Sequence, residues 1–171
     1  DAELKNQVDC LIKHMNSETR VYLGKTSIPI NALDICNRIG LTTAGALLTC
    51  VMKNLVPDAD IAMINGGAMR ANRIIEGDIY KKAILELVPF SDEKVVIEEK
   101  GKDLKSVLET SVRRLPDTNN GFLHTLGLKY TISLCNPAGK RVSDILVNGK
   151  PLNMEKSYKV VVNHFIASGG D

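Results

Sequence analysis

The sequence predicts an α+β fold in which helices pack on a mixed β-sheet. Its 171 residues, 44% of them hydrophobic, suffice for one domain with its own core. Segments 41–57 and 102–115 place apolar residues at helical spacing, whereas 59–64 and 157–163 are typical of strands. The two patterns do not alternate strictly along the chain, which argues against a doubly wound parallel sheet.

The N-terminal part begins with a predicted helix over residues 3–15. Residues 20–30 alternate loosely and are interpreted as a strand or an extended arm. Pro29 lacks the N–H that a central strand would use, so we do not expect this segment to be a central strand. The apolar face of the first helix would comprise Leu4, Val8, Leu11, Ile12 and Met15.

The helix predicted over 41–57 has start and stop signals. Thr42 or Thr43 can cap its N-terminus, and Pro57 follows its end. Its buried stripe is expected to be Leu47, Leu48, Val51, Met52 and Leu55.

In the middle of the chain, the apolar run 59–64 stops at glycines and predicts a buried strand. Residues 83–90 fit either a helix or a strand, 93–100 fit a strand, and 102–115 fit a helix. The buried face of that helix is expected to be Leu104, Val107, Leu108, Ser111, Val112 and Leu115. The remaining predicted strands are 128–134, 141–147 and 157–163, with a hairpin-type turn at 148–150.

Composition excludes several classes of function. A net charge of +2 is too small to indicate binding to nucleic acid or to a membrane surface. No apolar run approaches the ~20 residues of a transmembrane helix. The chain opens without Met and both ends look cut, so we expect a piece of a longer protein. The four cysteines form no C-x-x-C pair, and the sequence leaves open whether they are thiols or disulfides.

Catalytic motifs are scarce. There is no G-x-S-x-G, P-loop or H-E-x-x-H. His14, His124 and His164 are far apart, and "NHF" (163–165) lacks the glycine and the acid of the N-H-[D/E] metal motif. We interpret His164 as a strand residue. These residues predict a binding domain that holds no metal, rather than a self-sufficient enzyme.

The stretch "INGGAMR" (64–70) admits two interpretations. It is either a turn that ends a strand or a place where glycines let a ligand approach the backbone. Arg38 lies near a predicted helix N-terminus, which attracts anions, although a surface arginine is the simpler alternative. Core packing is the default for Phe90 and Phe165, and a turn is the default for Asp171.

Three motifs occur in register: "INGGAMR", "VPFSD" (88–92) and "NHFIASGGD" (163–171). Together with "GFLHTLGLKY" (121–130), they resemble the C-terminal domain of the 5'-nucleotidase family, which includes ecto-5'-nucleotidase and bacterial UDP-sugar hydrolase. The resemblance covers residues 18–171, and residues 1–17 resemble the linker helix to the preceding domain.

The resemblance implies a nucleotide-recognition domain of a two-domain, metal-dependent hydrolase that cleaves phosphate esters or anhydrides of nucleotides. Two divalent metal ions would be held by an N-terminal metallophosphoesterase domain that this chain lacks, so the chain alone is expected to be inactive. Its partners would be the nucleotide and that domain, at an extracytoplasmic site (secreted, periplasmic or cell-surface). The alternatives are a degenerate module that binds nucleotides without cleaving them, and a structural domain without a ligand.

The family pattern also implies roles for particular residues. The two arginines would face the phosphate, the two phenylalanines would sandwich the base, and Asp171 would accept hydrogen bonds from ribose hydroxyls. The glycines would bend the backbone beside the ligand, Asn65 would contact the nucleoside, and Asp92 would touch the base. The implied substrate-binding set is Arg38, Asn65, Gly66, Gly67, Arg70, Phe90, Asp92, Gly127, Phe165 and Asp171.

Two segments depart from the family pattern. The helix start commonly reads E-[ST]-x-[LM]-G-N-L, but here it is "LTTAGAL" (41–47), which affects the local support of Arg38. A common [SG]-G pair is replaced by Leu126 and Gly127, which would narrow the base pocket on one side.

Overall fold

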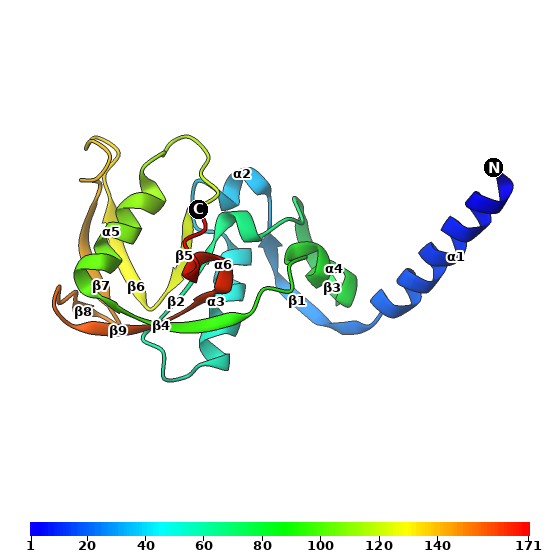
Figure 1. Ribbon diagram of the computed structural model, residues 1–171, viewed down its shortest axis with the longest axis horizontal. Coiled ribbons are helices and arrows are strands. Elements are labelled where there is room, and N and C mark those ends of the chain that lie inside the picture. The colour runs from blue at the N-terminus through cyan, green and yellow to red at the C-terminus, as the bar shows by residue number, and fades with distance from the viewer.

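The computed structural model describes residues 1–13 and 18–171. Figure 1 shows a body of sheets and helices from which α1 projects at one end. The helices are α1 (Ala2–Thr19), α2 (Asp34–Asn37), α3 (Thr43–Leu55), η1 (Gly66–Ala68), α4 (Lys81–Leu87), α5 (Gly101–Val112) and α6 (His164–Ala167). The strands are β1 (Tyr22–Asn31), β2 (Ile61–Asn65), β3 (Ile74–Tyr80), β4 (Lys94–Lys100), β5 (Leu123–Leu126), β6 (Leu128–Ile132), β7 (Val142–Val147), β8 (Lys150–Pro151) and β9 (Ser157–Asn163).

The central sheet has four strands in the order β4-β9-β2-β5. The inner pair β2 and β9 is parallel, whereas β4 and β5 run antiparallel to their neighbours. This mixed sheet confirms the predicted fold class. A two-stranded sheet (β1-β3) and a three-stranded sheet (β6-β7-β8) lie beside it.

Strand β2 is buried on both faces, which explains its unbroken apolar sequence. On one face, Ala62 and Ile64 pack in a cluster with Met52 of α3. On the other, Ile61 and Met63 pack in a cluster with Leu104 of α5. The two long helices of the body therefore hold the central sheet between them.

Strand β1 pairs with β3, and their ladder has a register irregularity between Thr26 and Ile30. Pro29 falls within this irregularity, where its missing N–H interrupts no ladder bond. The expectation that 20–30 would not be a central strand is confirmed. The predicted helices 3–15, 41–57 and 102–115 and the predicted strands from 59 onward are also confirmed within a few residues.

The sequence patterns missed α2, β3 and β5, and the ambiguous segment 83–90 begins as helix α4. The interpretation of His164 as a strand residue was wrong. Strand β9 ends at Asn163, and His164 begins the short helix α6.

The predicted buried stripe of α3 was partly wrong. Leu48 and Met52 pack in the core, but Leu47, Val51 and Leu55 are exposed, Leu55 by 70%. The helix instead turns small residues inward, among them Gly45, where an added Cβ would stand 1.9 Å from Nδ1 of His124. This close approach of α3 to β5 sets the rotation of the helix. In α5, the expected face is buried except for Val107.

Helix α1 presents its predicted apolar residues to solvent: Leu4, Val8, Leu11 and Ile12 are exposed. The expectations for His14 and Met15 fall outside the described residues. Within residues 1–13 and 18–171, no helix is both long enough and apolar enough to cross a membrane. The four cysteines, Cys10, Cys36, Cys50 and Cys135, form no disulfide with one another in the structure.

Candidate functional site

One edge of the central sheet gathers four chain segments. The parallel strands β2 and β9 both end there, at Asn65 and Asn163. Because β4 and β5 are antiparallel to them, those strands begin at the same edge: Lys94 pairs with Asn163, and Leu123 pairs with Asn65. The carboxyl ends of parallel strands are where α/β sheets commonly bind ligands.

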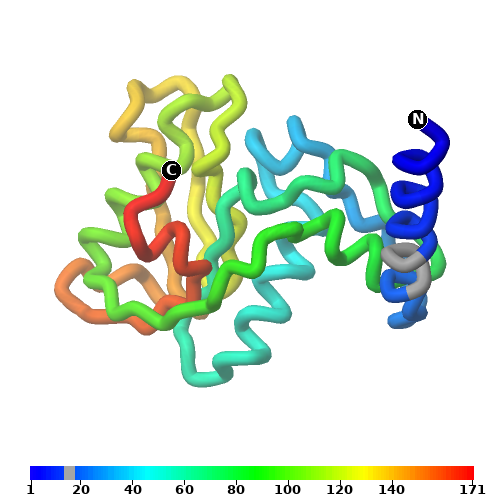
Figure 2. The backbone as a smooth tube through the Cα atoms, turned by 45° about the vertical axis from the view of Figure 1, so that its right-hand side comes forward, coloured from blue at the N-terminus to red at the C-terminus, as the bar shows by residue number. Residues whose placement is uncertain are grey.

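A cleft of about 720 Å³ lies at this edge. Its walls come from the end of β2, the loop before β4, the loop before β5, and the C-terminal segment. In Figures 1 and 2 the red C-terminal segment lies beside the green chain entering β4, where the N–H of His164 donates to the carbonyl of Glu93 at 2.8 Å. The lining residues are Asn65, Gly67, Ala68, Arg70, Pro89, Phe90, Ser91, Asp92, Asn120, Asn163, His164, Phe165, Ser168 and Asp171.

The structure thus brings seven of the ten predicted site residues to one cleft, although they are spread over more than 100 positions of the sequence. The seven are Asn65, Gly67, Arg70, Phe90, Asp92, Phe165 and Asp171. Arg38, Gly66 and Gly127 do not line it.

Two aromatic rings line the cleft with open faces. Phe90 is 50% exposed and Phe165 is 47% exposed, so neither is a core side chain. The guanidinium carbon of Arg70 lies 5.5 Å from the centre of the Phe90 ring. Gly170 backs the Phe165 ring so closely that an added Cβ would stand 2.5 Å from it. Each ring is therefore supported by a neighbouring residue while keeping about half of its surface exposed.

The polar floor of the cleft is a chain of amides and carboxylates. The Asn65 amide donates to Oδ2 of Asp171 in a short hydrogen bond. Asn163, only 3% exposed, donates through Nδ2 to Oδ2 of Asp92 at 3.0 Å and to Oδ1 of Asn65 at 3.4 Å. Its own Oδ1 is buried without a hydrogen-bond partner among the described residues.

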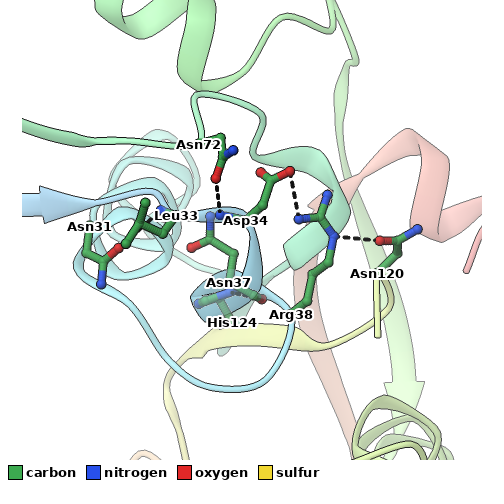
Figure 3. A network of polar contacts seen from close by, with 8 residues as sticks. All are labelled: Asn31, Leu33, Asp34, Asn37, Arg38, Asn72, Asn120 and His124. Atoms are coloured by element: carbon green, nitrogen blue, oxygen red, sulfur yellow. Dashed lines mark hydrogen bonds and ion pairs between the residues drawn. The ribbon is translucent and has the colours of Figure 1, made fainter. Parts of the chain in front are cut away.

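Arg38 follows directly after α2 and does not line the cleft; Figure 3 shows it between Asp34 and Asn120. Its Nη1 pairs with Oδ2 of Asp34 at 3.1 Å, and its Nε donates to Oδ1 of Asn120 at 2.7 Å. The Arg38 side chain is 12% exposed. Asn120 thus stands between this guanidinium and the cleft.

The glycines of "INGGAMR" allow neighbouring segments of the chain to pack closely against the end of β2. An added Cβ on Gly66 would stand 2.2 Å from the carbonyl oxygen of Asn37, so this glycine lets α2 approach the end of β2. The N–H groups of Gly66 and Gly67 donate to the carbonyls of Phe122 and Asn120, both at 2.8 Å. These contacts hold the loop before β5 against the cleft.

Gly127 connects β5 to β6 with φ +88°, a conformation that favours glycine. An added Cβ there would stand 2.4 Å from the carbonyl oxygen of Asp60, at the start of β2. Gly127 therefore lies at the end of β2 that is away from the cleft. Its positive φ and its close approach to Asp60 explain why a glycine occupies this position.

Sequence reasoning missed Asn120 and Asn163, both of which line the cleft. Asn163 precedes the "HF" pair of a recognised motif, but no periodicity distinguishes a buried amide from a strand residue. Asn120 follows Asn119 in a polar loop, a pattern that indicates only a turn. The alignment of strand ends is what places them.

Buried His124 supports the Arg38 side of the cleft from β5. Its Nε2 lies 3.0 Å from the carbonyl of Asn37, and its Nδ1 has no hydrogen-bond partner in the described part of the chain. Burial lowers the pKa of the His124 imidazole, and the carbonyl opposes that effect only in part. The neutral ring therefore donates through Nε2.

The sequence pattern described as "5'-nucleotidase, C-terminal domain" matches residues 22–171 of this chain. The chain belongs to this family. The family comprises hydrolases, and the fold described above is that of a 5'-nucleotidase C-terminal domain.

Several relatives of this 5'-nucleotidase domain are similar in sequence or structure. A snake venom 5'-nucleotidase of Macrovipera lebetinus is 28% identical over 199 residues, covering 100% of this chain and 47% of the relative. A 5'-nucleotidase of Diplobatis ommata is 30% identical, with 93% of this chain and 30% of the relative covered. The crystal structure of a 5'-nucleotidase precursor from Thermus thermophilus superposes with a TM-score of 0.89 at 30% identity, over 97% of this chain and 34% of that one. The chain thus spans less than half the length of these relatives.

The 5'-nucleotidase domain offers no metal centre of its own in the part of the chain that the structure describes. No three His, Cys, Asp or Glu side chains cluster there in a way that could hold an ion. The described residues therefore offer no ligand set for a metal ion.

Proposed function

We propose that this chain is the nucleotide-recognition domain of a two-domain, metal-dependent 5'-nucleotidase-like hydrolase. The whole protein would cleave phosphate esters or anhydrides of nucleotides. The single observation that carries the proposal is the cleft in which two half-exposed phenylalanines, a hydrogen-bonded chain of amides and carboxylates, and a guanidinium without an ion-pair partner among the described residues meet.

The dimensions and chemistry of the cleft suit a nucleoside phosphate. Phe90 and Phe165 offer π faces on which any base can stack. Asp171 offers carboxylate oxygens to a ribose diol, and Asn65 orients that carboxylate by donating to it. Arg70 forms no ion pair with any described residue, so its guanidinium is available for a phosphate.

Arg38 differs from Arg70 because its charge is already paired with Asp34 and its Nε is held by Asn120. We therefore assign it a supporting role on the phosphate side. The Asn120 amide, whose oxygen faces Arg38, turns its N–H donors away from Arg38, as Figure 3 shows. Asn120 would thereby add a neutral donor to the phosphate end of the cleft.

The bond-breaking chemistry would belong to a separate N-terminal metallophosphoesterase domain with two divalent metal ions. Such ions supply Lewis-acid catalysis when bound. This chain would bind the nucleotide, orient it and shield its base from water. Residues 1–17 would form the helix that links the two domains, and residues 18–171 the recognition domain.

We further propose an extracytoplasmic location, which the snake venom relatives support. The alternative is a degenerate family member that holds nucleotides without cleaving them. The altered helix start "LTTAGAL" favours this alternative, because Leu41 and Ala46 replace the Glu and the Asn of the family pattern near Arg38.

One experiment separates these functions. The full-length protein is assayed with divalent metal against nucleoside mono-, di- and triphosphates, nucleotide sugars and ribose 5-phosphate. We expect metal-dependent phosphate release with a preference for nucleotides over ribose 5-phosphate. Binding of nucleotides without turnover would establish the alternative, and absence of both would refute nucleotide recognition.

A further inference from the structure

Asp92 joins the two walls of the cleft that carry the aromatic rings. Its Oδ2 accepts hydrogen bonds from Nδ2 of Asn163 at 3.0 Å and from the backbone N–H of Phe165 at 3.3 Å. Phe90 lies two residues before Asp92 in the same loop. A single carboxylate oxygen therefore ties the loop of one ring to the backbone of the other ring.

This tie continues the sheet beyond its last paired residues. The ladder between β4 and β9 ends at Lys94 and Asn163. Past that point, the Glu93 carbonyl accepts from the His164 N–H at 2.8 Å, and Lys94 reaches back to the Asp92 carbonyl at 2.7 Å. Asp92 adds the outermost link, at the place where the two chains separate to form the cleft.

We propose that Asp92 is a positioning residue that fixes the spacing between Phe90 and Phe165, rather than a residue that reads the edge of the base. This inference rests on the proposed nucleotide recognition and goes beyond it. Oδ2 of Asp92 already accepts hydrogen bonds from two protein donors. One donor is the backbone N–H of Phe165, which carries a stacking ring, and the other is the Asn163 side chain, two residues before Phe165. The effect of Asp92 on binding should be the same for every base.

The chemistry of the tie dictates which substitutions preserve it. A carboxylate oxygen has lone pairs for two N–H donors, and so does the carbonyl oxygen of an asparagine amide. Asp92→Asn can therefore keep both bonds while replacing the other oxygen of Asp92 with an N–H₂ group. Asp92→Ala removes the tie altogether, and Asp92→Ser offers a hydroxyl that is too short to span it.

The test uses equilibrium dissociation constants of the full-length protein, with metal removed by a chelator so that no turnover occurs. The ligands are AMP and UMP, which carry different bases, and ribose 5-phosphate, which carries none. Glu93→Ala is the matched control, since it removes the neighbouring exposed carboxylate and leaves the backbone bond to His164 in place.

For Asp92→Ala we expect AMP and UMP to bind about tenfold more weakly, a loss of ~1.4 kcal/mol, while ribose 5-phosphate changes by less than about twofold. Asp92→Asn and Glu93→Ala should bind all three ligands like the unmodified protein. If Asp92→Ala does not fold, Asp92→Ser replaces it with the same expectation.

Three results would overturn the inference. Equal weakening of ribose 5-phosphate would mean that Asp92 supports the whole site rather than the ring spacing. A changed ranking of AMP and UMP in Asp92→Asn would mean that Asp92 reads the base. Unchanged nucleotide binding in Asp92→Ala would mean that the tie is dispensable. An unmodified protein that binds ribose 5-phosphate as tightly as AMP would instead refute the proposed function itself.

Discussion

The Nε of Arg38 lies 2.7 Å from Oδ1 of Asn120, although the two residues are 82 positions apart. This contact fixes the orientation of both groups, because a guanidinium N–H can donate only to the oxygen of the amide. Asp34 holds the same guanidinium from the other side at 3.1 Å. The geometry at this end of the cleft therefore depends on the Asn120 amide, which lines the cleft and holds the Arg38 guanidinium.

Replacing Asn120 by Ala should weaken binding of AMP to the full-length protein by about 0.5–1.5 kcal/mol, the net value of one hydrogen bond. Adenosine, which has no phosphate, should be affected much less. Calorimetric titration with both ligands measures the difference. Thr118→Ala, an exposed change in the same loop, is the control. An equal loss for adenosine would place Asn120 at the nucleoside instead.

Replacing Phe165 by Ala should weaken adenine and guanine nucleotides alike by roughly 1–3 kcal/mol, because stacking tolerates any base. The variant should remain folded, since the ring is 47% exposed. Phe122, which is 2% exposed, provides the contrast: Phe122→Ala should cost about 3–5 kcal/mol of folding stability. Thermal unfolding and nucleotide titration are measured on both. Heavy destabilisation of Phe165→Ala with normal binding would argue against stacking.

Replacing Arg70 by Ala should lower kcat/KM of the full-length protein with divalent metal by an amount equal to about 1.5–3 kcal/mol. Lysine should restore only part of it, since an ammonium cannot make the two-pronged contact with phosphate. Arg73→Ala is the matched control, because Arg73 pairs with Glu86 and does not line the cleft. Unchanged efficiency in Arg70→Ala would make Arg70 a bystander.

His124 should make the fold sensitive to mild acid. Burial lowers the pKa of its imidazole in the folded state, so below pH ~6.5 the unfolded chain binds a proton that the folded chain refuses. Stability from this group is fully present above that pH and falls as pH drops toward the folded-state pKa, by at most ~1.4 kcal/mol per pH unit. Denaturant unfolding of the full-length protein and of His124→Gln between pH 7 and 5 measures this contribution. The same slope in both proteins would contradict it.

The chain of 171 residues alone should release no phosphate from AMP when divalent metal is added. The physical reason is that its described residues offer no cluster of metal ligands. A phosphate assay on purified chain, with a contaminant control, tests this expectation. Metal-stimulated release that co-purifies with the chain would require a catalytic site within it.

The three long helices α1, α3 and α5 and most strands were predictable because their apolar spacing is local, and the motif residues were recognised from family resemblance. The rotation of α3 was not, because it depends on Gly45 meeting His124, two residues that no periodicity connects. The roles of Gly66 and Asn120 were equally hidden. Their partners, Asn37 and Arg38, lie in or directly after a helix of four residues that is too short to leave a pattern.

Strand β9 has a consequence for the order in which the molecule assembles. It is the last strand of the chain, yet it is inserted between β4 and β2, where Ile61 faces Val160 across almost 100 positions of sequence. Until it arrives, β2 and β4 each present an unpaired edge, and such edges readily pair with other chains. Contacts of this sequence separation form slowly.

During synthesis on the ribosome, the cleft between Phe90 and Phe165 would therefore form only after β9 has paired with β4. The nascent chain would acquire its helices early and its ligand site last. Chaperone dependence and co-translational aggregation should therefore be governed by how promptly residues 157–163 reach the gap left for them.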